Sequence, residues 1–258
     1  MWQTRPLTGT FGAEICGVDV LQHDDRLVQD IRTALDTFKV LVIPDQDSLT
    51  PDALLRFAEH FGTAERAAHP NWDDVPGHVG VKLLATADYR AGVDVGDSWH
   101  TDGPPRPLTQ WYSFLHARKV PPYGRDTLFA DMEAAYRRLS PALREFLETL
   151  TAVNSWGASK PDAPPVEHPV VMTDPQTGRK SLYVNRLYTR HICGLRQEES
   201  DALLELLYRQ TQVPELQLRV RWMPGTLTIW DNEKTQHYVI RDKQADRVMH
   251  RVMVNTGR

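Results

Sequence analysis

The order of the periodic segments along the chain is the sequence feature that most constrains its fold. Apolar residues at helical spacing occur early and midway, whereas short runs typical of strands dominate the second half. The expected helices cover residues 24–38, 51–61, 141–150 and 197–210, and the expected strands cover residues 40–43, 111–115, 182–184, 227–230 and 248–254. A doubly wound parallel sheet needs strict alternation of strands and helices, which this order lacks. We therefore predict a mainly β (α+β) protein whose β core is wrapped by flanking helices.

Proline concentrates in one irregular segment, residues 153–169. This segment contains Pro161, Pro164, Pro165 and Pro169 and few apolar residues that could anchor it. Such a composition is typical of a surface loop, so we predict a loop or lid here rather than a linker between domains. The chain of 258 residues is long enough to bury a large core. We therefore expect a single domain over residues 1–258 that carries a short lid at residues 153–169.

Charge and composition exclude several classes of partner. The chain has 30 Lys and Arg against 34 Asp and Glu, so its formal net charge is −4 and the basic excess of a general nucleic-acid or anionic-membrane binder is absent. It also has no apolar run of the length that spans a bilayer, and its first residues do not resemble a secretion signal. Its two cysteines, Cys16 and Cys193, are then expected to be reduced thiols. We expect a cytoplasmic protein with no nucleic-acid or membrane partner.

Histidine close to carboxylate is the chemistry that remains once common motifs are excluded. The chain lacks GxxxxGK[ST], GxGxxG, HExxH, CxxC and GxSxG, which mark P-loop, dinucleotide, zinc and serine-hydrolase sites. Two His-x-Asp triplets occur, a number that chance alone can produce. His23 and Asp25 stand at the start of a predicted helix, and we interpret them as capping and solvent-facing residues.

His100 and Asp102 have a more informative context. They lie in a short extended stretch, and residues i and i+2 of an extended chain project from the same face, so both side chains could reach one metal ion. A third ligand could come from His237, which follows a strongly apolar predicted strand. Two histidines and one carboxylate form the facial triad of non-haem Fe(II) oxygenases. From spacing alone, structural histidines with satisfied hydrogen bonds are the simpler interpretation.

The last predicted strand carries an independent signal. Its period of two places Arg247, Met249 and Arg251 on one face. Two guanidinium groups on one side of an apolar strand are costly to bury unless anions pair with them, and the planar guanidinium suits a carboxylate or sulfonate. The alternative is an edge strand with both arginines in solvent.

These residues belong to a larger set of motifs in a characteristic order. The motifs occupy residues 12–19, 42–46, 99–102, 124–128, 183–185, 229–232, 235–238 and 247–251. In this order and spacing the chain resembles, over nearly its whole length, the taurine/2,4-dichlorophenoxyacetate (TauD/TfdA) dioxygenases, which use Fe(II) and 2-oxoglutarate (alpha-ketoglutarate). The resemblance implies a double-stranded β-helix core, that is, a cupin-like jelly roll.

The resemblance also implies the site residues. By position, the Fe(II) ligands fall on His100, Asp102 and His237, and the contacts to the distal carboxylate of 2-oxoglutarate fall on Arg247 and Thr127. The residues expected to contact the organic substrate are Arg251, His69, Trp72, Tyr188 and Trp156. Arg251 would pair with the substrate anion, and His69 would also contact that anion. The aromatic residues Trp72, Tyr188 and Trp156 would line the binding site.

The implied function is an oxidoreductase, a dioxygenase that couples decarboxylation of 2-oxoglutarate to succinate and CO2 with hydroxylation of a small anionic organic substrate. Fe(II) is the implied cofactor, and 2-oxoglutarate and O2 are the cosubstrates. A sulfonate with C–S cleavage is the first expectation. An alkyl sulfate, an aryloxyalkanoate or an amino-acid-like biosynthetic intermediate is the alternative, and a jelly-roll binding protein without catalysis is a remote one. By analogy with the family, we expect a homo-oligomer, either a dimer or a tetramer.

Departures from the family pattern fall on the substrate side. Gly96 stands where taurine-specific members have asparagine, Gly103 stands after Asp102 where a larger apolar residue is usual, and the lid is shorter. None of these changes affects the expected iron or 2-oxoglutarate contacts. We therefore expect the reaction class of the family with a substrate other than taurine.

Overall fold

The computed structural model describes residues 2–69, 71–85, 98–106, 110–242 and 246–257. Gly96, on which part of the argument against taurine rests, lies outside the described residues.

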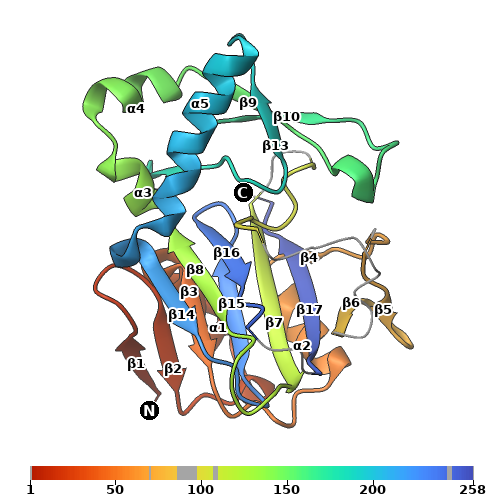
Figure 1. Ribbon diagram of the computed structural model, residues 1–258. Helices are drawn as coiled ribbons and strands as arrows, with labels where there is room; N and C mark the ends of the chain where they lie inside the picture. The colour runs from red at the N-terminus through yellow and green to blue at the C-terminus, as the bar shows by residue number, and fades with distance from the viewer. Residues whose placement is uncertain (1, 70, 86–97, 107–109, 243–245, 258) are drawn as a thin grey trace.

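Two sheets form the core of the molecule (Figure 1). The larger has the strand order β1 (Gln3–Pro6), β2 (Ala13–Cys16), β3 (Val40–Ile43), β15 (Leu227–Asp231), β7 (Trp111–Lys119), β17 (Val248–Asn255), β6 (His78–Ala85) and β5 (Asp74–Val75), with β4 (Thr63–Ala64) also paired to β17. The smaller has the antiparallel order β14 (Gln217–Val220), β8 (Thr127–Asp131) and β16 (Thr235–Val239). One buried apolar cluster joins Phe129 and Leu218 of the smaller sheet to Trp230 and Met249 of the larger. The sheets therefore face each other as the two layers of a jelly roll, which confirms the predicted fold.

Two helices cover the outer face of the larger sheet. In α1 (Asp25–Phe38) the first turn is capped by Asp24, whose carboxylate accepts a backbone hydrogen bond, and in α2 (Pro51–Glu59) Thr50 has the same role ahead of a proline. Their apolar faces, which include Ile31 and Phe57, pack in one buried cluster with Phe114 of β7. This packing leaves the opposite face of the sheet for the interior of the jelly roll.

A second layer lies above the jelly roll in Figure 1. It contains α3 (Met132–Arg138), α4 (Pro141–Leu147), α5 (Gln197–Tyr208), the sheet of β10 (Val166–Pro169), β9 (Thr151–Asn154) and β13 (Thr189–Ile192), and the hairpin of β11 (Val171–Thr173) and β12 (Lys180–Leu182). The described residues also form short 3-10 turns. In chain order these are η1 (Val20–Gln22), which contacts α2, and η3 (Gly157–Ser159), η4 (Arg209–Gln212) and η5 (Pro214–Leu216). A separate apolar cluster, with Leu147, Ile192 and Leu207 among its members, holds this layer together.

The segment predicted as a loop or lid is more regular than expected. Its two ends pair as the antiparallel strands β9 and β10, with Val166 opposite Asn154, and η3 lies between them. His168 of β10 donates a hydrogen bond from Nε2 to the carbonyl oxygen of Pro104. The hairpin is therefore anchored to the loop that follows Asp102.

Most expected elements are present, and the last strand is not at an edge. The four helices begin within one residue of the expected positions. The first ends where expected, at Phe38, and the other three end two or three residues earlier than expected. Strand β17 lies between β7 and β6, so the interpretation that Arg247 and Arg251 stand in solvent on an edge strand is wrong. Val184 was expected in a strand, but β12 ends at Leu182.

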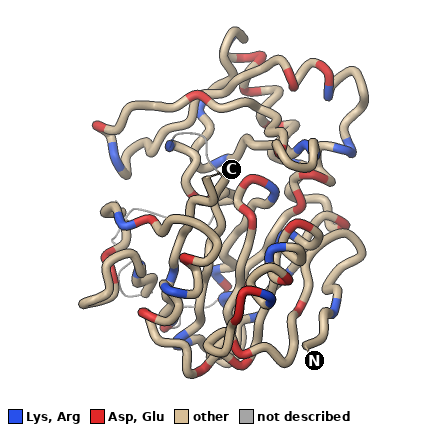
Figure 2. The backbone as a smooth tube through the Cα atoms, turned by 180° about the vertical axis from the view of Figure 1, so that it is seen from behind, with Lys and Arg blue, Asp and Glu red and all other residues tan. Residues whose placement is uncertain are grey.

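Over the described residues, none of the helices combines the length and apolar character that crossing a membrane requires. Basic and acidic positions are interspersed along the backbone seen from behind (Figure 2).

Candidate metal centre and substrate site

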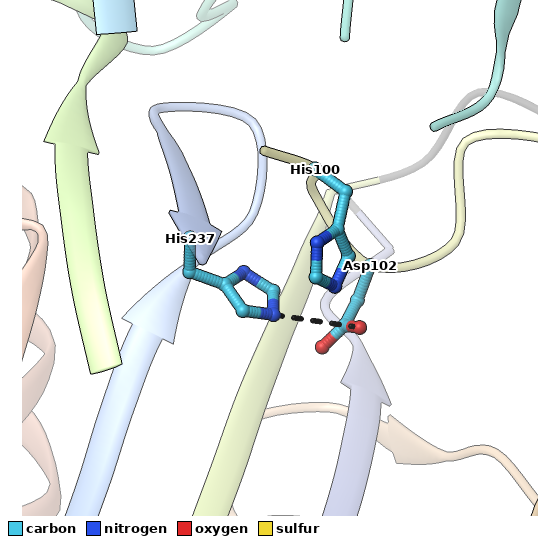
Figure 3. A group of neighbouring side chains, drawn as sticks. All are labelled: His100, Asp102 and His237. Atoms are coloured by element: carbon cyan, nitrogen blue, oxygen red, sulfur yellow. Dashed lines mark ion pairs between the residues drawn. The ribbon is translucent and has the colours of Figure 1, made fainter. Parts of the chain in front are cut away.

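His100, Asp102 and His237 converge at one end of the jelly roll (Figure 3). One potential ligand atom from each residue lies within 4.8 Å of the other two. The three residues are buried, with 4%, 5% and 7% of their surface exposed. His100 and Asp102 come from the loop before β7, whereas His237 is the central residue of β16. The structure therefore brings together the three residues that the sequence predicted as metal ligands.

A short piece of β ladder holds the two histidines. The His100 amide donates to the His237 carbonyl over 3.1 Å, and the His237 amide donates to the His100 carbonyl over 2.7 Å. The imidazole centroids are consequently 4.1 Å apart. Nδ1 of His100 lies 2.7 Å from the Ser98 carbonyl oxygen and must donate to it, which leaves Nε2 of His100 with the lone pair that a metal needs.

The Asp102 carboxylate is oriented at both oxygens. The Ser113 hydroxyl donates to Oδ2 over 2.8 Å, and Nη1 of Arg251 donates to Oδ1 over 3.0 Å. Asn232 supports this arrangement, because its Oδ1 accepts the Asp102 amide over 3.1 Å and its Nδ2 donates to the Ser113 hydroxyl over 2.8 Å. Asn232 is 2% exposed, and through these two hydrogen bonds it links the loop that carries Asp102 to β7. Hydrogen bonds to a metal-ligating carboxylate, such as those from Ser113 and Arg251, fix the direction of its lone pairs.

The electrostatics favour the protonation states that bind metal. Burial alone would raise the pKa of the Asp102 carboxyl, but Arg251 and the two neighbouring histidines hold it well below its usual range. Burial, together with the proximity of His100, lowers the pKa of His237 to about 3. At neutral pH Asp102 therefore presents a carboxylate and His237 a neutral imidazole, as metal ligation requires. This donor set fits non-haem Fe(II), and in the described part of the chain it is the one cluster of three such residues with this geometry.

Arg247 and Thr127 meet at one indole. The guanidinium carbon of Arg247 lies 5.3 Å from the centre of the Trp222 ring, and Nε1 of Trp222 donates to the Thr127 hydroxyl over 2.9 Å. Arg247 is 5% exposed and Thr127 is 2% exposed. The two residues predicted to hold 2-oxoglutarate are thus buried on neighbouring sides of the same ring.

The aromatic residues predicted for substrate binding form one group, which we call the aromatic cluster: His69, Trp72, Trp156 and Tyr188. The ring centroid of His69 lies 6.3 Å from that of Trp72 and 5.9 Å from that of Trp156. The centroids of Trp156 and Tyr188 are 5.4 Å apart. Tyr188 also lies 6.5 Å from the His100 ring, which joins the cluster to the metal ligands. Burial, assisted by Arg251 and Arg106, lowers the pKa of His69 to about 2, so this imidazole is neutral.

Sequence reasoning missed three residues of this region. Asn232 lies inside the quoted motif at 229–232, and Ser113 is a polar residue within an otherwise apolar strand, so both carried a weak signal. Arg106 follows two prolines four residues after Asp102, and nothing in the sequence singled it out.

Known proteins resemble this chain over nearly its whole length. The sequence model of the family described as "Taurine catabolism dioxygenase TauD, TfdA family" matches residues 3–253. An Acinetobacter baylyi protein named alkylsulfatase is 34% identical over 272 residues, covering 97% of this chain and 84% of that protein. A Saccharomyces cerevisiae protein named alpha-ketoglutarate-dependent sulfonate dioxygenase is 30% identical over 260 residues, covering 93% of this chain and 63% of that protein. The crystal structure of a taurine dioxygenase from Burkholderia xenovorans superposes with a TM-score of 0.87 at 32% identity, covering 98% of this chain and 90% of that one.

Proposed function

The chain belongs to the TauD/TfdA family of Fe(II)- and 2-oxoglutarate-dependent dioxygenases, and from this premise we propose that it oxidises a small organic sulfonate or sulfate ester. In this proposal His100, Asp102 and His237 hold the iron, and Arg247 and Thr127 hold the distal carboxylate of 2-oxoglutarate. The observation that carries it is the continuity of the site: Arg251 and the aromatic cluster both touch the metal ligands.

Each group of residues has a separate task. When bound, Fe(II) with 2-oxoglutarate and O2 supplies the oxidising chemistry, in which the cosubstrate loses CO2 and becomes succinate. The pair of Ser113 and Asn232 keeps the Asp102 carboxylate in one orientation, and the ladder between His100 and His237 fixes both imidazoles. The aromatic cluster surrounds the apolar part of the substrate and excludes water from the reacting carbon.

Arg251 can serve two anions at once. In the structure one of its nitrogens, Nη1, donates to Asp102. A guanidinium carries five N–H donors in a planar fork, so the remaining edge suits a sulfonate or sulfate group. An anion held there would place the adjacent carbon toward the metal ligands. Hydroxylation of that carbon releases sulfite from a sulfonate, or sulfate from a sulfate ester, and leaves an aldehyde.

The test is succinate formation with Fe(II), 2-oxoglutarate and O2 across a panel of substrates. The panel contains alkylsulfonates, alkyl sulfates, aryloxyacetates, phosphonates and amino acids, with a blank that lacks organic substrate. We expect stimulation by sulfonates or alkyl sulfates and no succinate from a His237→Ala variant. Stimulation by aryloxyacetates or amino acids alone would support the alternative substrates, and turnover by His237→Ala would show that the third metal ligand is misassigned.

Two further expectations accompany this function. Light scattering would show whether the protein is the dimer or tetramer that the family analogy predicts, and cell fractionation would test the cytoplasmic location.

A further inference from the structure

Arg106 is a partly buried cation beside the aromatic cluster that none of the assigned tasks uses. Its side chain is 17% exposed and forms an ion pair with Glu65, with 2.7 Å between Nη2 and Oε1. Its guanidinium carbon also lies 5.6 Å from the centre of the Trp111 ring and 5.3 Å from that of Trp156. Since Trp156 contacts both His69 and Tyr188, the charge of Arg106 lies next to the aromatic cluster.

Gly103 explains how the guanidinium reaches this position. Gly103 follows Asp102 and has a φ of +82°, a backbone conformation that other residues rarely adopt. A Cβ atom at Gly103 would lie 2.9 Å from Nη1 of Arg106, so a larger residue there would displace the guanidinium from this position. The space next to the metal loop that an apolar side chain would fill is therefore occupied by a cation. The glycine and the arginine form one structural feature.

Two of the cations beside the aromatic cluster are each paired with a carboxylate. Arg251 is paired with Asp102, and Arg106 is paired with Glu65. His69 is a neutral imidazole, so it cannot pair with an ammonium group as a carboxylate does. An ammonium group on a substrate would meet the Arg106 guanidinium, and the carboxylate that could accept it, Glu65, is already engaged. Like charges at close range in a desolvated site are strongly unfavourable.

We propose that Arg106, paired with Glu65, determines specificity at this site by selecting substrates whose sole charge is the sulfonate or sulfate group. A substrate with an apolar body is accepted, and one with an ammonium group at its far end is rejected. This inference rests on the proposed function and narrows its substrate class.

The experiment compares two isosteric sulfonates, butane-1-sulfonate and 3-aminopropane-1-sulfonate, in which an ammonium replaces the terminal methyl group. Dissociation constants are measured without O2 by tryptophan fluorescence of the protein loaded with Fe(II) and 2-oxoglutarate, and kcat/KM is measured by succinate formation. For the wild type we expect about 10- to 100-fold preference for butane-1-sulfonate in both quantities.

Variants separate the roles of the two charges. Arg106→Met frees Glu65 to accept the ammonium, so the preference should shrink by about tenfold or reverse. The double variant Arg106→Met with Glu65→Gln should lose the gain in aminosulfonate binding, and Arg106→Lys should retain the wild-type preference. Glu65→Gln alone leaves the cation unpaired and should increase the preference. This last variant tests the proposal even where Arg106→Met does not fold.

The contrary outcomes are distinct. If Arg106→Met weakens both sulfonates equally, Arg106 is an anion ligand or a packing residue, and the inference is wrong. An equal affinity of the wild type for both compounds also overturns it, while leaving the proposed function intact. If neither sulfonates nor alkyl sulfates bind the wild type at all, the proposed function itself fails and the inference falls with it.

Discussion

Replacing Ser113 with alanine should weaken metal binding without touching a metal ligand. Ser113 is fully buried, and its hydroxyl donates to Oδ2 of Asp102 over 2.8 Å. The variant removes this hydrogen bond and leaves Nδ2 of Asn232 with a single, longer contact of 3.3 Å to the Trp111 carbonyl. The Asp102 carboxylate is then free to turn about its remaining contact to Arg251.

The expected loss follows from the charge of the acceptor. A hydrogen bond to a charged group contributes about 1.5–3 kcal/mol, and loss of a second-shell contact typically weakens metal affinity about 10- to 100-fold. Because Arg251 still holds Oδ1, we expect the lower part of this range, about 10- to 30-fold. The geometry of the histidines should not change, since their ladder does not involve Ser113.

Anaerobic titration with Mn(II) or Fe(II) against a competing fluorescent chelator measures this affinity directly. Ser200→Ala is the matched control, because Ser200 is also fully buried and accepts one hydrogen bond, from the Ile192 amide over 2.9 Å, in the separate layer of α5. We expect both variants to lose stability to urea and Ser113→Ala alone to lose metal affinity. Affinity within twofold of the wild type in a folded Ser113→Ala protein would refute the assignment of Asp102 as an oriented metal ligand.

Further predictions concern the anion sites and pH. Arg247→Ala should raise the 2-oxoglutarate concentration needed for half-maximal succinate formation, by a loss on the order of 2–5 kcal/mol, and an unchanged requirement would place the cosubstrate elsewhere. Arg251→Ala should raise KM for the organic substrate much more than that for 2-oxoglutarate; the reverse would exchange the two roles. Burial lowers the pKa of His116 and His250 to about 4, whereas the unfolded chain takes up their protons near pH 6.5. Stability to urea should therefore fall between pH 7 and pH 5, on the order of 1–2 kcal/mol per histidine, and a pH-independent transition would contradict this.

The sequence predicted the elements that carry their own local signals. Helices α1 and α2 are marked by a capping residue and by apolar residues at helical spacing, so their positions could be predicted without tertiary information. Strand β16 was missed because Thr235 and Gln236 are buried polar residues, and its sequence does not alternate between apolar and polar. It is a strand because β8 pairs with it along its length. That pairing is invisible in a local pattern.

The same distinction applies to the site. His100 and Asp102 are neighbours in sequence, so the spacing of an extended chain was enough to predict that they share a face. The Asn232 contacts join segments 119 and 130 positions apart in the sequence. A single sequence carries no trace of such long-range hydrogen bonds unless the motif is already known. The motif that contains Asn232 and the polar Ser113 in an apolar strand gave a weak signal, but only the structure showed that these residues orient Asp102.

The central position of β17 in its sheet explains why Arg247 and Arg251 are buried. Arg251 lies in this central strand and Arg247 directly precedes it, and the two residues are 7% and 5% exposed, so each guanidinium needs a negative partner to offset its desolvation. Asp102 meets part of that requirement for Arg251, but the same carboxylate is also a predicted metal ligand. A metal ion bound to Asp102 would neutralise part of the carboxylate charge. The Arg251 guanidinium beside the aromatic cluster would then be only partly compensated. The site is thus built to gain an organic anion together with its metal, and this coupling would make substrate affinity depend on metal loading.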